Sequence, residues 1–570
     1  MLVLGMFCLF LFFLGIGHIG LIGADEPRYA QIAREMLARG DWITPVLRGR
    51  PWLEKPVLYY WEAMVSYRLL GVSDWAARIP SAFDATVMIV AVYFILHRLR
   101  PALGTGNQEV GTVYSCAPLD AALITASTSF VLGFAHAAST DMPLTASFTI
   151  GMLAWIAWWQ PSLPAAPFRF APGTEAGRSR VWLLGFYVFM GLGTLAKGPV
   201  APLLAGLIIS LFAAIRRDGQ LIRRTLWWPG MLLYLLIAAP WYVLVQLRTG
   251  VFFRAFLLEH NLERYNTALF GHQQPFWYFL PVTLAALAPW TVLAVAGFVQ
   301  AIRQNAFPVS SFQFPEALSH APSANSDAGN WKAETGNLSL FLALWGAVPV
   351  AFFSFSVSKL PGYILPAVPP FAILAALWLG GKRLTSAKIP PALLTLHGLL
   401  AGGTLSLVLL SPYMLLRLNP PKQALTVAAA AGIVFAGAIL LGAVRFGVRA
   451  LRFLTILPIL AGLGFLLRVA VPQLDDQVSA RQVAHEIVRL EPEKAPVAVT
   501  RVDRELEYGL GFYLNQPIAR YERNGVPAGD HLLVSRSPLG EPEVSLPDRR
   551  LTMLGRYPAQ QLALYWVEHK

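Results

Sequence analysis

The sequence predicts an all-α membrane protein that crosses the bilayer many times and ends in a small α/β domain. Hydrophobic residues make up 56% of the 570 residues and charged residues 14%, and the mean hydropathy is +0.53. A water-soluble chain of this length does not have such a composition. Long apolar runs recur up to residue 471, and the composition becomes mixed and polar beyond it. These observations together predict the fold class.

The apolar runs are long enough to be membrane-spanning helices. A helix needs roughly 17–25 apolar residues to cross the hydrocarbon, and about thirteen runs meet this requirement. The first, Met1 to Gly23, has no basic segment ahead of its apolar part, so we expect a span rather than a cleavable signal. The other runs are separated by Pro- and Gly-rich joints and centre near Val90, Ile124, Ala154, Val188, Leu207, Leu236, Ala288, Ala347, Ala375, Leu405, Ile433 and Leu460.

The positive charge is explained by membrane topology. The chain has 45 Lys+Arg and 32 Asp+Glu, a net charge of +13. Basic residues gather in alternate loops, as expected for cytoplasmic loops, so no nucleic-acid partner is predicted. With a cytoplasmic N-terminus, the first long loop, residues 24–80, lies on the extracytoplasmic face. An odd number of spans then places the tail on that face too. Cys8 and Cys116 both lie in or beside apolar runs, which argues against a disulfide framework or a zinc cluster.

The tail is predicted to fold as its own unit. We divide the chain into a transmembrane catalytic domain, residues 1–471, and an extracytoplasmic α/β domain, residues 472–570. The second unit is long enough to hold a core of its own. Its patterns predict one amphipathic helix and three short strands: helix Asp475–Leu490 and strands Pro496–Val502, Pro517–Tyr521 and His531–Ser535.

The first loop carries the most informative polar residues. Pro27 is suited to the first turn of a helix that Asp25 or Glu26 could cap. Ile32, Met36 and Leu37 lie on one apolar face of this helix, as expected for a helix along the membrane surface. On a purely structural interpretation, Asp25 is a cap and Arg28 contacts a lipid headgroup. Later in the loop, Glu54 and Lys55 adjoin Trp and Tyr residues, which favour the interface for their own reasons.

Other joints are predicted to bring polar groups to the same face. Asp141 follows a short loop and is interpreted either as a cap before Pro143 or as a second functional carboxylate. Lys197 is a lone cation between apolar spans, where charge is costly unless it is paired. Further polar side chains follow in later joints: Glu259, His260, Glu263, Arg264, Tyr265, His272, Lys359 and Tyr363.

These residue types suit chemistry on a phosphate that is anchored in lipid. Cations would hold the phosphate and stabilise its charge as it leaves, while a carboxylate accepts the proton of the attacking group. No nucleotide is expected, because the sequence has neither a G-x-x-x-x-G-K-[ST] loop nor a dinucleotide-binding fingerprint after a strand.

The motifs resemble those of bacterial GT-C glycosyltransferases of the aminoarabinose transferase and protein O-mannosyltransferase type. The resemblance covers the whole chain and is most specific over residues 25–61. The motifs that carry it are Asp25-Glu26-Pro27-Arg28-Tyr29, Arg34-Glu35-Met36, Gly40-Asp41-Trp42, Glu54-Lys55-Pro56, Thr140-Asp141, Lys197-Gly198-Pro199, Pro275-Phe276-Trp277-Tyr278, Ser358-Lys359-Leu360-Pro361 and Tyr363-Ile364-Leu365-Pro366. It implies the GT-C fold and an inverting transfer of one sugar from a polyprenyl phosphate.

The resemblance also implies roles for individual residues. Asp25 matches the acidic position after the first span and is the expected general base. Asp141 matches a second acidic position, which orients the acceptor or assists Asp25. The donor phosphate is expected to bind Lys55, with Arg28, Arg264, Lys197 and Tyr363 as further candidates.

Glu54 has two alternative roles under the same resemblance. It either positions the neighbouring Lys55 or joins His260 or His272 at a divalent metal. One carboxylate and two distant histidines are a poor match to the clustered ligands of a catalytic zinc. The expected donor is a polyprenyl-phosphate sugar, and a divalent metal stays open as an alternative.

The leading prediction is a multi-pass enzyme of the bacterial inner membrane with a periplasmic active site. It would move 4-amino-4-deoxy-L-arabinose from undecaprenyl phosphate to lipid A, with membrane lipids as its surroundings. A first alternative keeps the donor type but transfers to protein Ser/Thr, as in O-mannosylation, or to another envelope acceptor. A second is a lipid transporter or flippase, which would place polar residues near span midpoints.

Overall fold

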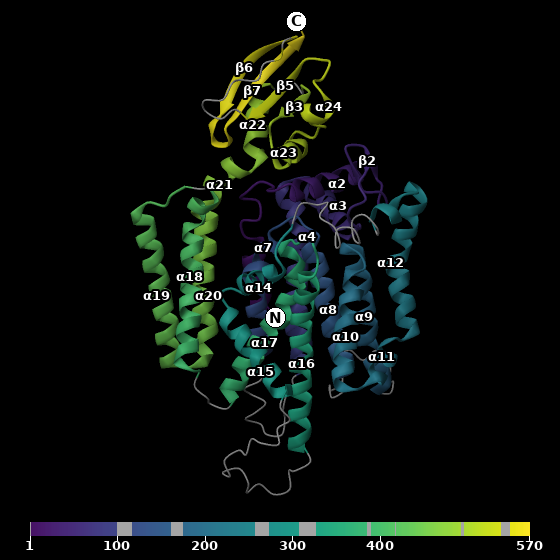
Figure 1. Cartoon of the computed structure of the whole chain (residues 1–570), viewed down its shortest axis with the longest axis vertical. Helices are drawn as coiled ribbons and strands as arrows, with labels where there is room; N and C mark the ends of the chain where they lie inside the picture. Colours follow the sequence, from purple (N-terminus) through teal and green to yellow (C-terminus); the bar gives the residue numbers. More distant parts are fainter. Residues whose placement is uncertain are drawn as a thin grey trace.

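The computed structural model is a bundle of long helices with a small sheet domain above one end (Figure 1). It describes residues 2–99, 117–160, 175–256, 273–306, 327–384, 389–416, 418–491, 495–536, 546 and 548–569. Two helices of the first loop, α2 (Asp25–Arg39) and α3 (Leu58–Leu70), lie between the bundle and the sheet domain. The polar first loop is therefore enclosed between the apolar bundle and the tail.

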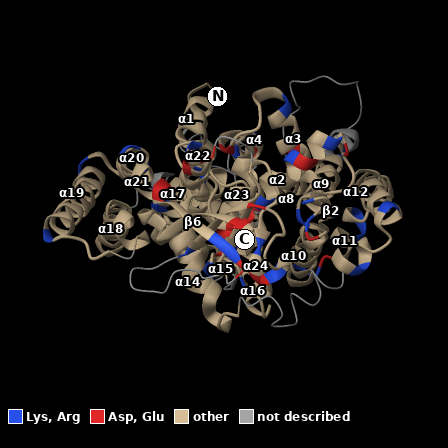
Figure 2. Ribbon diagram, turned by 90° about the horizontal axis from the view of Figure 1, so that it is seen from above, with Lys and Arg blue, Asp and Glu red and all other residues tan. Residues whose placement is uncertain are grey.

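The bundle consists of apolar helices and bent helix pairs. Its members are α1 (Leu2–Phe13), α4 (Asp74–Arg98), α6 (Ala117–Ala126), α7 (Ser129–Ala135), α8 (Asp141–Trp159), α9 (Glu175–Lys197), α10 (Val200–Arg216), α12 (Trp228–Thr249), α14 (Phe279–Ala286), α15 (Thr291–Ala306), α16 (Asp327–Ser354), α17 (Val368–Leu384), α18 (Pro391–Leu415), α19 (Lys422–Phe446) and α20 (Val448–Phe465). Short helices α11 (Gly219–Thr225), η3 (Phe276–Tyr278), η5 (Pro361–Ala367) and η6 (Leu466–Ala470) connect or extend them. Seen from above, most of the helical ribbon belongs to uncharged residues (Figure 2).

The chain is a multi-pass integral membrane protein. Among the described residues, 8 helices are long and apolar enough to cross a membrane, or up to 10 if each bent pair is one span. The expectation of about thirteen spans is therefore not confirmed as a count. Twelve of the thirteen predicted runs centre within a helix of the bundle or extend over one, and Ala288 falls at the 115° bend between α14 and α15. The candidate spans leave out α1, α9 and α10, of which α1 and α10 are shorter than a full span.

Helix α2 differs from the predicted surface helix. Its apolar face, including Ile32 and Met36, is fully buried by protein rather than by lipid. The same hydrophobic cluster contains Tyr59 and Tyr60 of α3 and Phe512 of the tail. The N-terminus of α2 has no side-chain cap, so the predicted capping by Asp25 or Glu26 is wrong. The helix ends at Gly40, which has a φ of 63° that favours glycine.

The tail forms the predicted α/β fold with more strands than expected. Its sheet has the order β4-β3-β5-β7-β6, in which β3 runs parallel to β4 and β5, and β7 runs antiparallel to β5 and β6. The expected single helix is divided at Ser479, whose extended backbone separates two helices. The elements are α21 (Val471–Val478), α22 (Ala480–Leu490), β3 (Val497–Thr500), α23 (Arg504–Leu514), β4 (Ala519–Arg520), α24 (Tyr521–Asn524), β5 (His531–Arg536), β6 (Arg549–Tyr557), η7 (Pro558–Gln560) and β7 (Leu562–His569). The predicted division of the chain near residue 472 falls within the last long helical segment, Ala450–Val478.

A buried ion pair joins the first loop to the bundle. Arg78 of α4 is 2% exposed and donates to both carboxylate oxygens of Glu26, at 3.1 and 2.6 Å. Its remaining N–H groups donate to the carbonyls of Ile16, Ile19 and Gly20. Buried charges need partners of this kind, because unpaired ones are costly. The pair therefore fixes the chain segment between α1 and α2.

Glu26 is also satisfied by backbone donors. The N–H of Ile22 donates to Glu26 Oε2 at 2.8 Å, and the N–H of Ala138 donates to Oε1 at 2.7 Å. Ala138 lies just ahead of α8. One carboxylate thus connects the ends of α1, α2, α4 and α8.

A second arginine fixes the same segment from the tail. Arg481 of α22 donates to the carbonyls of Gly17 and His18 and to the carboxylates of Asp74 and Asp475. Asp475 in turn accepts from the N–H of Gly20 at 2.7 Å. The tail is consequently tied to the first loop by polar bonds as well as by packing.

The Glu26–Arg78 pair yields a stability prediction. Replacing Arg78 with methionine leaves the Glu26 carboxylate buried without its ion-pair partner, and breaking such a pair costs about 3–5 kcal/mol. We expect Arg78→Met to lower the thermal unfolding midpoint of the detergent-purified protein and its folded yield, both followed by fluorescence-detected size exclusion. Arg489→Met is the matched control, because Arg489 is 73% exposed and pairs with Glu486 on the surface, where a pair contributes about 0–1 kcal/mol. Equal melting of the two variants would contradict the prediction.

Candidate functional site

Asp25 lies at the start of α2, on the side of the bundle that carries the sheet domain (Figure 1). Its side chain is 58% exposed and contacts the Arg28 guanidinium. Arg28 is 13% exposed and lies 3.7 Å from the Glu54 carboxylate. The guanidinium carbon is within 5.1–5.8 Å of the ring centres of Tyr29, Trp52 and Tyr508. Arg28 is thereby fixed between two carboxylates and three aromatic rings. Of the two carboxylates, Asp25 remains open to solvent.

Asp141 forms a second charged group at the start of α8. Its carboxylate contacts Lys197 Nζ and accepts from Ser139 Oγ at 3.2 Å. Lys197 ends α9 and lies 5.1 Å from the ring centre of Tyr363. A Cβ on Gly362 would come within 2.8 Å of Asp141 Oδ1, so a glycine at 362 leaves room for this carboxylate.

Tyr29 lies at the junction of the two charged groups. Burial raises the pKa of its phenol, and Asp25, Arg28, Asp141 and Glu54 all act on the ring electrostatically. Lys55 and Lys197 both lie close enough to interact with the Asp141 carboxylate. The structure therefore brings together Asp25, Arg28, Glu54, Lys55, Asp141, Lys197 and Tyr363, although they are widely separated in sequence.

Three predicted residues, Arg264, His260 and His272, lie outside the described residues. In the part of the chain that the structure describes, no group of three His, Cys, Asp or Glu residues could hold a metal ion. The metal role suggested for Glu54 with His260 or His272 therefore stays a prediction. Lys359 donates to the carbonyls of Gln274 and Ser356.

The tail covers the first loop from above. Arg48, in the turn between β1 (Val46–Leu47) and β2 (Arg50–Pro51), donates to the buried Glu507 carboxylate at 2.7 Å. Arg34 donates to the Phe512 carbonyl at 2.8 Å. Since Glu507 and Phe512 belong to α23, this helix lies directly over α2. The charged residues around Asp25 are consequently shielded from water on that side by the tail.

Sequence reasoning missed the residues that position the site. Arg78, Arg481 and Tyr29 received no role, and Glu26 was considered only as a cap. Arg78 did carry a signal, because an arginine near the start of an apolar helix is costly unless it is paired. Its partner could not be identified from spacing, because Glu26 lies 52 residues earlier.

The arrangement can hold an anion and accept a proton. Lys55, Lys197 and Arg28 supply positive charge beside one exposed carboxylate, Asp25, and one largely buried carboxylate, Asp141. Cations in a shielded site stabilise developing negative charge more strongly than in water. An open carboxylate can serve as a general base. Transfer of a group from a lipid phosphate needs both functions.

Comparison with known proteins supports the predicted resemblance. Residues 4–253 match the family described as dolichyl-phosphate-mannose-protein mannosyltransferase. An undecaprenyl phosphate-alpha-4-amino-4-deoxy-L-arabinose arabinosyl transferase of Pseudomonas fluorescens is 30% identical over 360 residues, 62% of this chain and 55% of that protein. A protein of Pseudomonas aeruginosa with the same name is 28% identical over 361 residues, 63% of this chain and 56% of the relative. The chain thus spans little more than half the length of these relatives.

Solved structures confirm the predicted GT-C fold. The crystal structure of ArnT from Cupriavidus metallidurans bound to undecaprenyl phosphate has a TM-score of 0.72 and 22% sequence identity, and the match covers 99% of this chain and 97% of that one. The apo state of the same protein has a TM-score of 0.71 and 21% identity. At this level of identity the likeness establishes the fold, including the helical bundle and its C-terminal domain.

The turn after α2 yields a prediction about pH. Partial burial acts to raise the pKa of Asp41, but the N–H groups of Ile43 and Thr44 and the guanidinium of Arg248 outweigh it and hold the pKa below its usual 3.8. The stabilisation from a carboxylate with a lowered pKa is fully present above the unfolded pKa and is lost as the pH falls through the folded one. Asp41→Asn should therefore lower the free energy of unfolding at pH 7 and at pH 5. The expected loss is about 1.5–3 kcal/mol, as for hydrogen bonds to a charged group.

The difference between wild type and Asp41→Asn should shrink towards zero as the pH falls through the lowered pKa of Asp41, because the wild-type carboxyl is then protonated too. Thermal unfolding of both proteins across this range measures it. A difference that stays constant with pH would contradict the assignment. Asp503→Asn is the control, because Asp503 is 65% exposed and pairs with Arg536 on the surface.

Proposed function

We propose that the protein is a glycosyltransferase that moves one sugar from a polyprenyl-phosphate donor to an acceptor of the bacterial envelope. The observation that carries the proposal is the meeting of two carboxylates, Asp25 and Asp141, with the cations Arg28 and Lys197 around Tyr29. We take 4-amino-4-deoxy-L-arabinose as the sugar, undecaprenyl phosphate as its carrier and lipid A as the acceptor. The names of the two Pseudomonas relatives support this choice of sugar and carrier.

In the proposed reaction, an acceptor oxygen attacks the anomeric carbon from the face opposite the donor phosphate. The new C–O bond forms as the bond between the anomeric carbon and the phosphate oxygen breaks. The bonding electrons leave with undecaprenyl phosphate, and the configuration of the sugar inverts. Where the acceptor oxygen carries a proton, Asp25 accepts it, because its carboxylate is the open one at the site.

The other residues have distinct parts in this proposal. Lys55 binds the donor phosphate, and Arg28, Lys197 and Tyr363 support it, together with Arg264 from outside the described residues. Asp141 is held by Lys197 and Ser139 and orients the acceptor. Glu54 lies 3.7 Å from Arg28, which supports a role in positioning the cations. No step of the proposed reaction uses a nucleotide.

The location follows from the proposed reaction. We place the protein in the bacterial inner membrane, with the first loop and the tail on the periplasmic side. Basic residues at the opposite helix ends, such as Arg216 and Arg445, agree with a cytoplasmic face there. We treat residues 472–570 as a separate unit that covers the site, since Arg481 and Glu507 attach it to the first loop.

A second candidate changes the acceptor. The match of residues 4–253 to a protein mannosyltransferase family favours transfer to Ser or Thr of an envelope protein, with mannose as the sugar. The two functions share the donor type and the expected role of Asp25. They differ in the product, which makes them separable by mass.

The first prediction of this proposal concerns lipid A. Cells that express wild type should yield lipid A with a pentosamine-sized mass increment, and cells that express Asp25→Asn should not. The amide keeps the shape of the side chain but cannot accept a proton, and loss of a general base lowers a rate by about 10²–10⁴-fold. Mass spectrometry of extracted lipid A measures the outcome, with the amount of folded protein checked by size exclusion.

Glu505→Gln is the matched control, because Glu505 is an exposed carboxylate of α23. It should leave the increment unchanged. Unmodified lipid A with folded wild-type protein would remove lipid A as the acceptor, and a hexose on envelope proteins would then support the second candidate. Full modification by Asp25→Asn would rule out Asp25 as the general base.

A further inference from the structure

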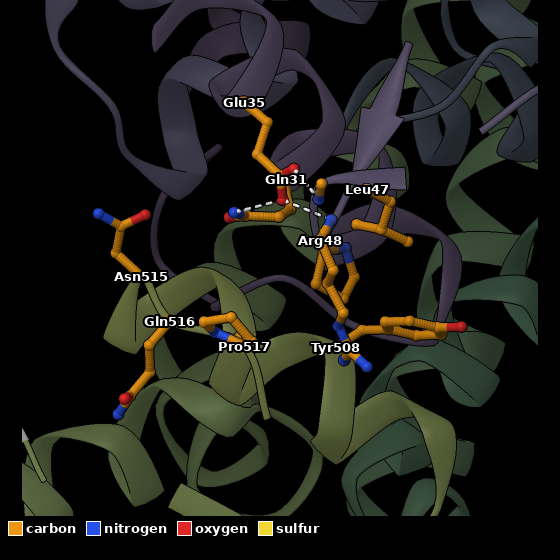
Figure 3. Close-up of a pocket in the computed structure, with 11 residues that line it drawn as sticks. Gln31, Glu35, Leu47, Arg48, Tyr508, Asn515, Gln516 and Pro517 are labelled. Atoms are coloured by element: carbon orange, nitrogen blue, oxygen red, sulfur yellow. Dashed lines mark hydrogen bonds between the residues drawn. The ribbon is translucent and has the colours of Figure 1, made fainter. Parts of the chain in front are cut away.

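A pocket of about 230 Å³ lies between the first loop and the tail. Its walls come from α2 and the β1–β2 turn on one side and from α23 and the chain that follows it on the other (Figure 3). Figure 3 shows Gln31, Glu35 and Arg48 facing Gln516 and Pro517 across this space. The charged groups around Asp25 and Asp141 are a separate feature, because none of the residues in those groups lines this pocket.

The pocket has polar groups that are not yet satisfied. Arg48 Nη2 and Gln31 Oε1 are buried and have no hydrogen-bond partner among the described residues. Buried polar atoms are normally paired, so an unpaired donor and an unpaired acceptor on residues that line one pocket call for an explanation. A bound group with both hydroxyl donors and acceptors would satisfy the two atoms together.

Neighbouring contacts hold these side chains in place. Glu35 accepts from Gln31 Nε2 at 3.0 Å and from the N–H groups of Arg48 and Gly49 at 3.0 and 3.3 Å (Figure 3). Arg48 Nη1 is fixed by the buried Glu507 at 2.7 Å. The free Nη2 and Oε1 atoms are therefore presented by side chains whose other ends are already bound. A preorganised site of this kind loses little conformational entropy when it binds.

The remaining walls combine amides with apolar surface. Asn515 and Gln516 add two more side-chain amides, and Tyr508, Leu47, Pro27 and Pro517 add apolar faces. Among the lining residues, one cation, Arg48, is balanced by one anion, Glu35. This balance suits an uncharged polar ring better than a phosphate. The volume is below the roughly 300–1,000 Å³ of pockets for drug-sized ligands, which fits one sugar ring and excludes a lipid chain.

The pocket is close to the open carboxylate. Gln31 lies six residues after Asp25 on the same helix, about 9 Å at 1.5 Å per residue. Tyr508 connects the two regions, since its ring centre is 5.8 Å from the Arg28 guanidinium and 5.2 Å from that of Arg48. The pocket and the open carboxylate therefore lie on the same helix, with the Tyr508 ring in contact with both regions.

We propose that this pocket is a saccharide subsite that binds a non-reacting sugar ring of the acceptor. The proposal rests on the proposed function for the identity of that acceptor, a lipid-linked saccharide. The ring would accept a hydrogen bond from Arg48 Nη2 and donate one to Gln31 Oε1, while its C–H groups contact Tyr508 and Leu47. The tail thereby takes part in choosing the acceptor, in addition to covering the site.

Two variants of the full-length protein test the subsite. Gln31→Leu keeps the side-chain size and removes the amide. Gly511→Leu fills the pocket, because a Cβ at 511 meets its nearest neighbours, including Arg48 Nη2, at ordinary distances of 3.7–4.0 Å. Glu505→Leu, on the exposed face of the same helix, is the control. Folding of all three is checked by thermal unfolding in detergent.

The first readout is binding and needs no turnover. Deacylated lipid A saccharide is titrated into each protein and followed by saturation-transfer NMR. We expect binding to wild type and Glu505→Leu. Binding to Gln31→Leu and Gly511→Leu should be at least about tenfold weaker, which corresponds to a loss of about 1.4 kcal/mol of binding free energy. Equal binding by wild type and both pocket variants would overturn the proposal, as would displacement by a Ser/Thr peptide instead of the saccharide.

The second readout is the rate of transfer against acceptor and donor concentration. Both pocket variants should raise the KM for the acceptor about tenfold and leave the donor KM and kcat within about twofold of wild type, since the lost contact acts equally in ground and transition states. An unchanged acceptor KM overturns the subsite while the transferase stands. Pocket-dependent saccharide binding by a protein that transfers no sugar supports the subsite and removes the proposed function instead.

Discussion

The buried pair of Glu26 and Arg78 is the constraint on which the site depends. A charge in a low-dielectric interior must be matched by partners on every side, and here the partners come from four parts of the chain. Arg78 of α4 holds three carbonyls that follow α1, and Glu26 holds the N–H groups of Ile22 and Ala138. Once this pair forms, the starts of α2 and α8 are fixed relative to each other. Asp25 and Asp141 lie at those two starts.

The same constraint extends to the tail. The segment that Arg78 holds from below is held from above by Arg481 and Asp475, through Gly17, His18 and Gly20. Gly20 allows this approach, because a Cβ there would come within 2.1 Å of Ser479 Oγ. The tail is thus positioned by the backbone whose conformation the ion pair sets. Helix α23 then lies over α2, which places the Tyr508 ring in contact with the guanidinium groups of both Arg28 and Arg48.

The helices of the bundle were predictable because hydrocarbon leaves few options for the backbone. A chain in lipid must satisfy its own N–H and C=O groups, so a long apolar run is a helix. The tail lacks that constraint. Helix α23 contains Gly509 and Gly511, which lower its helix propensity. Strand β6 is largely exposed or half-buried, so it has no clear alternation of apolar residues, and neither element was predicted.

The site was predictable only in part, for a related reason. Composition and topology indicate which helix ends share a face, but they do not bring Asp25 together with Asp141 or Lys197, which lie more than 100 residues further along the chain. The family resemblance supplied that grouping. It did not supply the pocket around Gln31 and Arg48, because that pocket depends on how the tail packs on the first loop. The hydrophobic pattern of the first loop and that of the tail each predict local structure, but neither predicts which residues of the two segments contact each other.

Asp25 and Glu26 show how one helix turn can divide structural and chemical roles. Adjacent residues on a helix point about 100° apart, so the two carboxylates meet different surroundings. Glu26 is 6% exposed and accepts from Arg78 and from two backbone N–H groups. The Asp25 side chain is 58% exposed and contacts Arg28. The first carboxylate is occupied by bonds that hold the start of the helix, and because the helix is held there, the second carboxylate can remain open at a fixed position.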